Sequence, residues 1–296
     1  MERISRAYSE AISPLIGEKI DIPAPDVNTN GKIMSWMVDA YENVVKKSAP
    51  GVFTGKPVEF GGSLARTEAT GYGVNFAAVQ ALEKLGKDVK GATYAIQGFG
   101  NVGYHTGYYA HQSGAKVVAV STVDVAIYNE NGLDMEALFK EFQEKGFITN
   151  EAGYGKEISN AELLALDVDV LAPCALENQL TSENAGKVRA KIVVEGANGP
   201  TTPEADAILR QNGVLVVPDI LANCGGVVVS YFEWVQNLQG YYWEFDEVQE
   251  KETVVLRRAF RDIWNLAQEY DVDLRTASYM MSIRRGEKAM KLRGWY

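Results

Sequence analysis

A short apolar run that leads directly into a glycine-rich segment constrains this chain more than any other feature. Residues Thr93–Gln97 (TYAIQ) favour a buried strand, and Gly98, Gly100 and Gly103 follow with G-x-G-x-x-G spacing. Residues 101–112 then favour a helix. A strand, a glycine loop and a helix in this order suit phosphate groups, because the first N–H groups of the helix face the anion. The segment therefore predicts a dinucleotide-binding loop.

The chain after this loop alternates between short β-branched runs and helical stretches. Further strands are predicted at 116–121, 168–171, 192–195 and 214–217, and helices at 135–145, near Ser182 and at 203–211. This alternation predicts an α/β fold with a Rossmann-like, doubly wound, mostly parallel sheet. Helices are also predicted ahead of the first strand, at 4–16 and 31–48, and the segment after residue 225 is predicted to be mostly helical.

Composition excludes several classes of function. The net charge is −10, and an acidic surface repels phosphate backbones, so we expect no nucleic-acid partner. No segment approaches the roughly 18 apolar residues of a membrane helix, so we expect no membrane partner either. The two cysteines, Cys174 and Cys224, lie far apart and favour a reducing cytoplasm over a disulfide framework. The two histidines lack neighbouring ligands, and we expect no metal site.

The end of the second predicted strand bears on the choice of cofactor. In NAD-binding proteins an acid near this point bonds the ribose diol, whereas here the strand ends at Ser121 and Thr122. Their hydroxyls can bond a ribose or contact a 2′-phosphate. The nearest acid, Asp124, serves equally well as a turn cap. Both NAD and NADP therefore stay open as cofactors.

Several longer segments resemble the glutamate/leucine/phenylalanine/valine dehydrogenase family, over essentially the whole chain. They are DIPAPDVNTN from Asp21, TGKP from Thr54, GGSLARTEATGYGV from Gly61, QGFGNVG from Gln97, EGANGPTTPEAD from Glu195 and PDILANCGGVVVSYFEW from Pro218. The form of EGANGPTTPEAD resembles the glutamate branch more than the leucine and phenylalanine branch. The resemblance implies NAD or NADP as cofactor and oxidative deamination of L-glutamate to 2-oxoglutarate and ammonium.

The resemblance also implies roles for single residues. Asp26 matches the catalytic aspartate, which exchanges protons with the substrate amine and the imine intermediate. Gly226, Val227 and Ser230 match substrate-binding positions, and Ser230 matches the one that contacts the side-chain carboxylate. The glycine motif and the resemblance together give the cofactor-binding positions Arg66, Thr70, Gln97, Gly98, Phe99, Gly100, Asn101, Val102, Gly103, Ser121, Thr122, Asn198 and Asn223.

The resemblance divides the chain into three parts. Residues 1–60 match part of the substrate and oligomerisation domain, and residues 61–274 match the dinucleotide-binding domain. Residues 275–296 match a C-terminal helix that returns to the substrate domain. Because the family forms homo-hexamers, the resemblance implies assembly, although it leaves the oligomeric state of this chain open.

One segment of the family, P-x-G-G-x-K-G-G, has no counterpart in this sequence. In the family one of its lysines holds the α-carboxylate and another activates the attacking water. Lys56, in TGKP, matches a different segment. We therefore expect this chain to bind the dinucleotide but to turn over slowly or not at all alone. Two alternatives stay open: an NAD(P)-binding regulatory or interaction module, and another amino-acid dehydrogenase of the family.

Overall fold

The chain forms two compact units in a computed structural model, which describes residues 1–26 and 28–295. Unit 1 comprises Met1–Ala69 and Gly226–Glu252, and unit 2 comprises Thr70–Gly225 and Thr253–Tyr296. These units differ from the predicted parts, whose boundaries lie after residues 60 and 274. The predicted parts are defined by function rather than by packing. Their assignment to substrate, cofactor and returning segments therefore stays a prediction.

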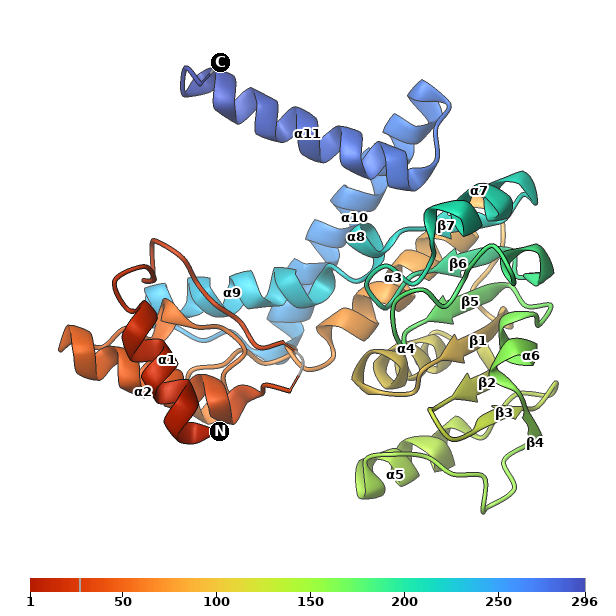
Figure 1. The fold of residues 1–296 in the computed structure, drawn as a ribbon. Coiled ribbons are helices and arrows are strands. Elements are labelled where there is room, and N and C mark those ends of the chain that lie inside the picture. The colour runs from red at the N-terminus through yellow and green to blue at the C-terminus, as the bar shows by residue number, and fades with distance from the viewer. Residues whose placement is uncertain (27, 296) are drawn as a thin grey trace. The chain divides into compact units, whose positions relative to one another are not determined.

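Unit 2 is built on a seven-stranded sheet with the strand order β4-β3-β2-β1-β5-β6-β7 (Figure 1). The strands are β1 (Thr93–Gln97), β2 (Lys116–Ser121), β3 (Ala126–Tyr128), β4 (Lys156–Ile158), β5 (Val170–Pro173), β6 (Ile192–Val194) and β7 (Leu215–Val217). The pairs β2–β1, β1–β5, β5–β6 and β6–β7 are parallel. Strand β3 pairs antiparallel with both β2 and β4. The prediction of a mostly parallel sheet is confirmed.

Helices cover both faces of this sheet. One face packs against α3 (Ala69–Lys84), α4 (Asn101–Gln112), α5 (Met135–Lys145), α10 (Phe245–Tyr270) and α11 (Leu274–Leu292). The other packs against α6 (Asn160–Leu164), the 3₁₀ helix η3 (Ala185–Lys187) and α7 (Pro203–Gln211). Side chains alternate along a strand, so Tyr94 and Ile96 of β1 enter the first core and Ala95 enters the second. This arrangement is the doubly wound α/β fold that the sequence predicts.

Most predicted elements of unit 2 are present, but the short ones are not all predicted. β1, β2, α4, α5 and α7 have the predicted bounds, whereas β3, β4, α6 and α8 (Asp219–Ala222) were not expected. The helix predicted near Ser182 is instead the 3₁₀ helix η3, a few residues later. β3 and β4 have three residues each, which is too short for hydrophobic alternation to be recognised.

Unit 1 contains α1 (Glu2–Ile12), α2 (Gly31–Val45), the 3₁₀ helices η1 (Pro50–Val52) and η2 (Val58–Phe60), and α9 (Gly225–Gln239). The helix predicted over residues 4–16 is therefore shifted towards the N-terminus and ends earlier. The small residue Ser9 of α1 faces inward, and its hydroxyl donates to the carbonyl oxygen of Met37 on α2 at 2.6 Å. Ile4 and Tyr8 lie exposed as a consequence.

The segment after residue 225 is helical, as predicted. It consists of α9, α10 and α11, and α10 begins in unit 1 and continues in unit 2. Across residues 1–26 and 28–295, none of the helices combines the length and the apolar character that crossing a membrane requires.

Candidate functional site

The three glycines of the loop between β1 and α4 differ in what the chain itself requires of them. Gly98 has a φ of +88°, and a Cβ there would lie 2.6 Å from the Cα of Ala175. A Cβ at Gly103 would overlap the carbonyl oxygen of Gly98. By contrast, Gly100 has a φ of −88° and a ψ of −160°, and a Cβ there meets no atom within 4 Å. Internal packing thus explains Gly98 and Gly103 but not Gly100.

The end of β2 holds this loop in place. The N–H groups of Gly98 and Phe99 donate to the carbonyl oxygen of Ser121 at 3.0 and 2.6 Å. Helix α4 begins directly after the loop, so the N–H groups of Val102 and Gly103 have no acceptor within the helix. These donors and the positive end of the helix dipole favour an anion at the loop.

Two residues of the motif direct their side chains into the protein. Phe99 is 2% exposed and packs among aromatic rings of α4 and α5. Gln97 is also 2% exposed, and its Nε2 donates to Oε1 of Gln179 at 2.6 Å. Both side chains support the loop from within, and direct contact of either residue with a cofactor stays a prediction.

The hydroxyl groups at the end of β2 are used within the chain. The Oγ of Ser121 accepts a hydrogen bond from the N–H of Gly98 at 3.2 Å. The Oγ1 of Thr122 accepts from the N–H groups of Asp124 and Val125, at 3.3 and 3.2 Å, and closes a tight turn. Asp124 lies exposed on this turn. A contact of Ser121 or Thr122 with the cofactor ribose stays a prediction.

Thr70 lies in the first turn of α3, which approaches two other segments of unit 2. A Cβ at Gly71 would lie 2.7 Å from the carbonyl oxygen of Val102, so α3 and α4 cross at close range. A Cβ at Gly73 would lie 3.2 Å from the carbonyl oxygen of Ala222. These two glycines hold Thr70 near the first turn of α4 and the end of α8.

Asn198 and Asn223, which are predicted to contact the cofactor, bond each other in unit 2. The Nδ2 of Asn223 donates to Oδ1 of Asn198 at 2.7 Å and to the carbonyl oxygen of Gly196 at 3.2 Å. A carbonyl oxygen can only accept, so the contact with Gly196 fixes the orientation of the Asn223 amide. The pair therefore presents one donor, Nδ2 of Asn198, and one acceptor, Oδ1 of Asn223.

Arg66 and Ser230, two predicted site residues of unit 1, are in direct contact. The Nε of Arg66 donates to the Oγ of Ser230 at 2.9 Å. Because Oγ accepts this bond, the hydroxyl proton of Ser230 remains available for a further acceptor such as a carboxylate. Burial lowers the pKa of Arg66, and nearby carboxylates oppose this shift. Gly226 and Val227 lie one turn earlier on α9, with Gly226 buried and Val227 exposed.

Asp26 lies at an exposed turn of unit 1. Its N–H donates to the Oγ1 of Thr29 at 2.7 Å, and its carbonyl oxygen accepts from the N–H of Thr29 at 2.9 Å. The preceding Pro25 packs against Gly55, where a Cβ would lie 2.5 Å from the Cδ of the proline ring. The loop that contains Gly55 therefore supports the segment that carries Asp26.

A buried ion pair, which sequence reasoning missed, joins this loop to α9. The Nζ of Lys56 donates to Oε1 of Glu233 at 2.6 Å, and also to the carbonyl oxygen of Phe53 and to Oδ1 of Asn237. The Oε2 of Glu233 accepts from the N–H of Gly55 at 2.9 Å. Both charged side chains are fully buried, and burial lowers the pKa of Lys56 while Glu233 opposes this. The pair fixes the loop to the helix that carries the predicted substrate-binding residues.

Glu252 is a second buried acid of unit 1, and sequence reasoning missed it as well. It is 1% exposed, and its carboxyl oxygens have no hydrogen-bond partner among the described residues. Burial raises its pKa from 4.5 to about 9, with a smaller increase from Glu68 that Arg66 opposes. The carboxyl group of Glu252 is therefore neutral at pH 7 in the folded chain.

This buried acid predicts a pH-dependent stability. Because its pKa is higher in the folded chain, the folded chain binds more protons between about pH 4.5 and 9, and stability falls as pH rises through this window. Glu252→Gln should raise the melting temperature at pH 8 by about 3–8 °C and leave it nearly unchanged at pH 4. Thermal melts followed by circular dichroism measure this, with the exposed Glu183→Gln as control. Equal melting temperatures at pH 8 would contradict it.

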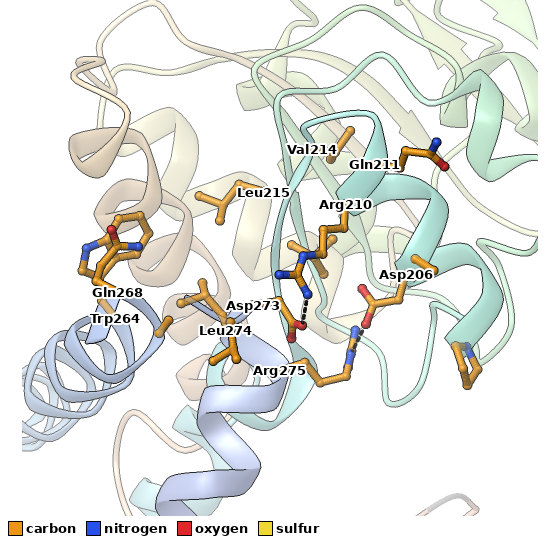
Figure 2. A pocket seen from close by; sticks show the side chains of 15 residues that line it. Asp206, Arg210, Gln211, Val214, Leu215, Trp264, Gln268, Asp273, Leu274 and Arg275 are labelled. Carbon is orange, nitrogen blue, oxygen red and sulfur yellow. Dashed lines mark hydrogen bonds and ion pairs between the residues drawn. The ribbon is translucent and has the colours of Figure 1, made fainter. Parts of the chain in front are cut away.

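The structure also shows where a cavity lies and whether side chains are grouped to bind a metal. A cavity of about 720 Å³ lies along β7, between α7 and the start of α11, and none of the predicted site residues lines it (Figure 2). Among the described residues, no group of three or more His, Cys, Asp or Glu side chains is arranged to hold a metal ion.

Comparison with protein families gives a match over most of the chain. Residues 61–294 match the model of the glutamate/leucine/phenylalanine/valine dehydrogenases. The chain belongs to this family. Residues 1–43 match the model of the Glu/Leu/Phe/Val dehydrogenase dimerisation domain. The resemblance that the sequence motifs indicate is confirmed, and with it the class of NAD(P)-dependent amino-acid dehydrogenases.

Several relatives and solved structures that resemble this chain are named glutamate dehydrogenases. The NAD-specific glutamate dehydrogenase of Clostridioides difficile is 54% identical over 301 residues, and the glutamate dehydrogenase of Thermotoga maritima is 50% identical over 297. Each match covers 100% of this chain and 71% of the relative. The crystal structure from Peptoniphilus asaccharolyticus is 44% identical, with a TM-score of 0.87, and the match covers 100% of this chain and 71% of that one. The hetero-hexameric enzyme of Thermus thermophilus, in its Leu-bound form, is 34% identical, with a TM-score of 0.93 and shares of 100% and 70%.

Proposed function

We propose that this chain is a glutamate dehydrogenase that oxidatively deaminates L-glutamate with NAD. Gly100 carries the cofactor part of the proposal, because the chain itself does not need a glycine there, whereas a diphosphate lying against the backbone does. The N–H groups of Val102 and Gly103 supply donors for that diphosphate. Relatives at 54% and 48% identity are named NAD-specific glutamate dehydrogenases, which supports NAD over NADP.

The nicotinamide end of the cofactor is proposed to lie against Asn198 and Asn223. A carboxamide has one carbonyl acceptor and one amide donor, and these complement Nδ2 of Asn198 and Oδ1 of Asn223. NAD supplies the chemistry of hydride acceptance from the α-carbon of the substrate. The two asparagines orient the ring for that transfer, and Thr70 is proposed to lie beside it.

The substrate end is proposed to be formed by residues of unit 1. The hydroxyl group of Ser230 donates a hydrogen bond to the side-chain carboxylate of glutamate, since its oxygen already accepts one from Arg66. The charge of Arg66, which we also propose as a cofactor-binding residue, favours the same carboxylate. Asp26 takes a proton from the substrate amine and returns one during hydrolysis of the imine. Gly226 and Val227, in the first turn of α9, are proposed to contact the substrate.

The protein is proposed to assemble into a homo-hexamer. Residues 1–43 match a dimerisation domain, and the Thermus thermophilus enzyme is described as hetero-hexameric. Small molecules are its proposed partners, and the net charge of −10 argues against nucleic acid. The chain has only two cysteines, Cys174 and Cys224, far apart in sequence, which suits the proposed cytoplasmic location. A regulatory module or a dehydrogenase for another amino acid is not favoured, because the similar relatives act as glutamate dehydrogenases by name.

Binding and reaction are tested separately. NADH should give a saturable change in its fluorescence when titrated with the chain, and absence of saturation with both NADH and NADPH would refute the cofactor site. L-Glutamate should support reduction of NAD better than L-leucine or L-phenylalanine does. Because the P-x-G-G-x-K-G-G segment has no counterpart in this sequence, we expect that rate to be slow, and Asp26→Asn should lower it further while the dissociation constant for NADH stays unchanged. An unaltered rate in this variant would remove Asp26 from the mechanism.

A further inference from the structure

A single arginine contacts both of the segments that carry Asn198 and Asn223. Arg275 lies in the first turn of α11, and its Nη2 contacts Oε1 of Glu195 at 2.6 Å. Its Nη1 lies 3.5 Å from Oδ1 of Asp219, and its Nε contacts Oδ2 of Asp206 on α7 at 2.6 Å. The whole guanidinium group is therefore committed to three carboxylates.

Two of these carboxylates are anchors for the asparagine loops. Oε2 of Glu195 accepts from the N–H of Asp219 at 2.8 Å, and Oδ2 of Asp219 accepts from the N–H of Gly199 at 2.8 Å. Glu195 begins the loop that carries Asn198, and Gly199 directly follows that asparagine. Asp219 begins α8, which ends just before Asn223. One bonded network thus sets the positions of both amides.

The network depends on the positive charge of Arg275. The Glu195 side chain is fully buried, and burial raises its pKa while the bonds with Arg275 oppose this. Burial also works against the charge of Arg275, but its bonds with Glu195 and Asp206 outweigh this and raise its pKa. Without the arginine, Glu195 would remain buried without a counter-charge, which a protein relieves by moving or protonating the group.

We propose that Arg275 is a positioning residue for the nicotinamide end of the cofactor. This inference rests on the proposed function, in which Asn198 and Asn223 bond the carboxamide. Arg275 does not touch the cofactor. It holds Glu195 and Asp219, and these fix the spacing between Nδ2 of Asn198 and Oδ1 of Asn223. A shift of about 1 Å in such a pair is enough to weaken the binding of a ligand that both atoms must reach together.

A second ion pair near Arg275 provides a matched control (Figure 2). Nη1 of Arg210 on α7 contacts Oδ2 of Asp273, directly before α11, at 3.2 Å. This pair also connects α7 to the start of α11, as Arg275 does through Asp206. It makes no bond to Glu195 or Asp219 in the described chain, and Arg210 is largely exposed. Arg210→Gln therefore removes a similar helix contact without touching the asparagine loops.

The experiment compares two ligands that differ only at the nicotinamide. NADH presents the carboxamide, whereas ADP-ribose keeps the diphosphate and both riboses but lacks it. We expect Arg275→Met to raise the dissociation constant for NADH by about tenfold, which corresponds to the loss of one hydrogen bond. The dissociation constant for ADP-ribose should stay within twofold of its value for the unaltered chain. Arg275→Lys, which keeps the charge but not the fork, should give an intermediate loss. Arg210→Gln should change neither constant.

The outcomes separate this inference from the proposed function. If the unaltered chain bound neither ligand, the proposed cofactor site would fail. If it bound both, but Arg275→Met and Arg275→Lys weakened them equally or not at all, Arg275 would have no positioning role. Circular dichroism shows whether each variant is folded, and Arg275→Lys alone decides the matter if the methionine variant is not. A selective loss of NADH binding in Arg210→Gln would also overturn the proposal.

Discussion

Replacing Lys56 by methionine is expected to lower the free energy of unfolding by about 3–5 kcal/mol. The substitution keeps most of the apolar stem but removes the charge that faces Glu233, and both side chains are fully buried. Glu233 would then be a buried carboxylate whose remaining donors are the N–H groups of Gly55 and residue 56. Two such weak donors cannot replace an ammonium group, so unit 1 should melt at a markedly lower temperature.

Two further variants show whether the buried charge causes this loss. Glu233→Gln in the Lys56→Met background removes the charge but keeps an acceptor for the N–H of Gly55, so it should recover part of the stability. Lys291→Met breaks an exposed pair with Glu287 and should leave the melting temperature nearly unchanged. Thermal and urea unfolding followed by circular dichroism provide the values. A Lys56→Met chain as stable as the parent would mean that the pair contributes nothing.

The same substitution separates the two units functionally. Lys56 and Glu233 lie in unit 1, whereas the glycine loop lies in unit 2. NADH binding should therefore be retained by Lys56→Met at temperatures where unit 2 is folded. Loss of NADH binding in a folded variant would argue that unit 1 contributes to the cofactor site.

The core of unit 2 could be predicted from sequence because its signals are local. The bounds of β1 and α4 follow from an apolar run, a glycine loop and a helical pattern within twenty residues. α6 was missed although Ser159 and Glu162 form a capping box, which is a recognisable start signal. Five helical residues after that box give too little periodicity to be noticed. β4 was missed because its residues are mostly exposed and charged.

The ion pairs that stabilise the candidate site could not be predicted in this way. Lys56 and Glu233 lie 177 residues apart, and Arg275 and Glu195 lie 80 apart, so no spacing rule connects them. Charged residues in sequence are normally solvated, and only the tertiary structure shows which ones are buried. Glu233 gave one weak signal, because it interrupts an otherwise apolar and aromatic stretch of α9.

The structure brings some of the predicted site residues into direct contact. Asn198 bonds Asn223, and Arg66 bonds Ser230 across 164 residues of sequence, although only the family resemblance singled out Ser230 and Asn223. The glycine motif, by contrast, does not tell which of its side chains face inward. Phe99 lies in the same core as Tyr94 and Ile96, although strict alternation along β1 would turn it to the other face, because the chain turns at Gly98 with a φ of +88°.

The glycine loop allows a paired test in which neighbouring substitutions fail for different reasons. Gly100→Ala adds a methyl group in open space, with a backbone conformation that any residue adopts. Its melting temperature should match that of the parent. A bound diphosphate, however, would meet the new methyl group, so the dissociation constant for NADH should rise by about 10- to 100-fold.

Gly103→Ala should instead damage the fold before any ligand is added. The new Cβ would overlap the carbonyl oxygen of Gly98, and neither backbone can yield without displacing α4 from β1. Overpacking of this kind costs about 1–3 kcal/mol and sometimes more, so both the melting temperature and NADH binding should fall. Thermal melts and NADH titrations of the two variants, measured side by side, give all four values.

ADP-ribose makes the paired test specific for the diphosphate. Gly100→Ala should weaken ADP-ribose and NADH to the same degree, since both carry the group that approaches the backbone. Loss of Arg275 should weaken NADH alone, because the network around Glu195 reaches the asparagine pair and not the loop. Normal NADH binding by Gly100→Ala would place the diphosphate away from this loop. The open space around Gly100 would then have no ligand to explain it, and the orientation proposed for the whole cofactor would have to be abandoned.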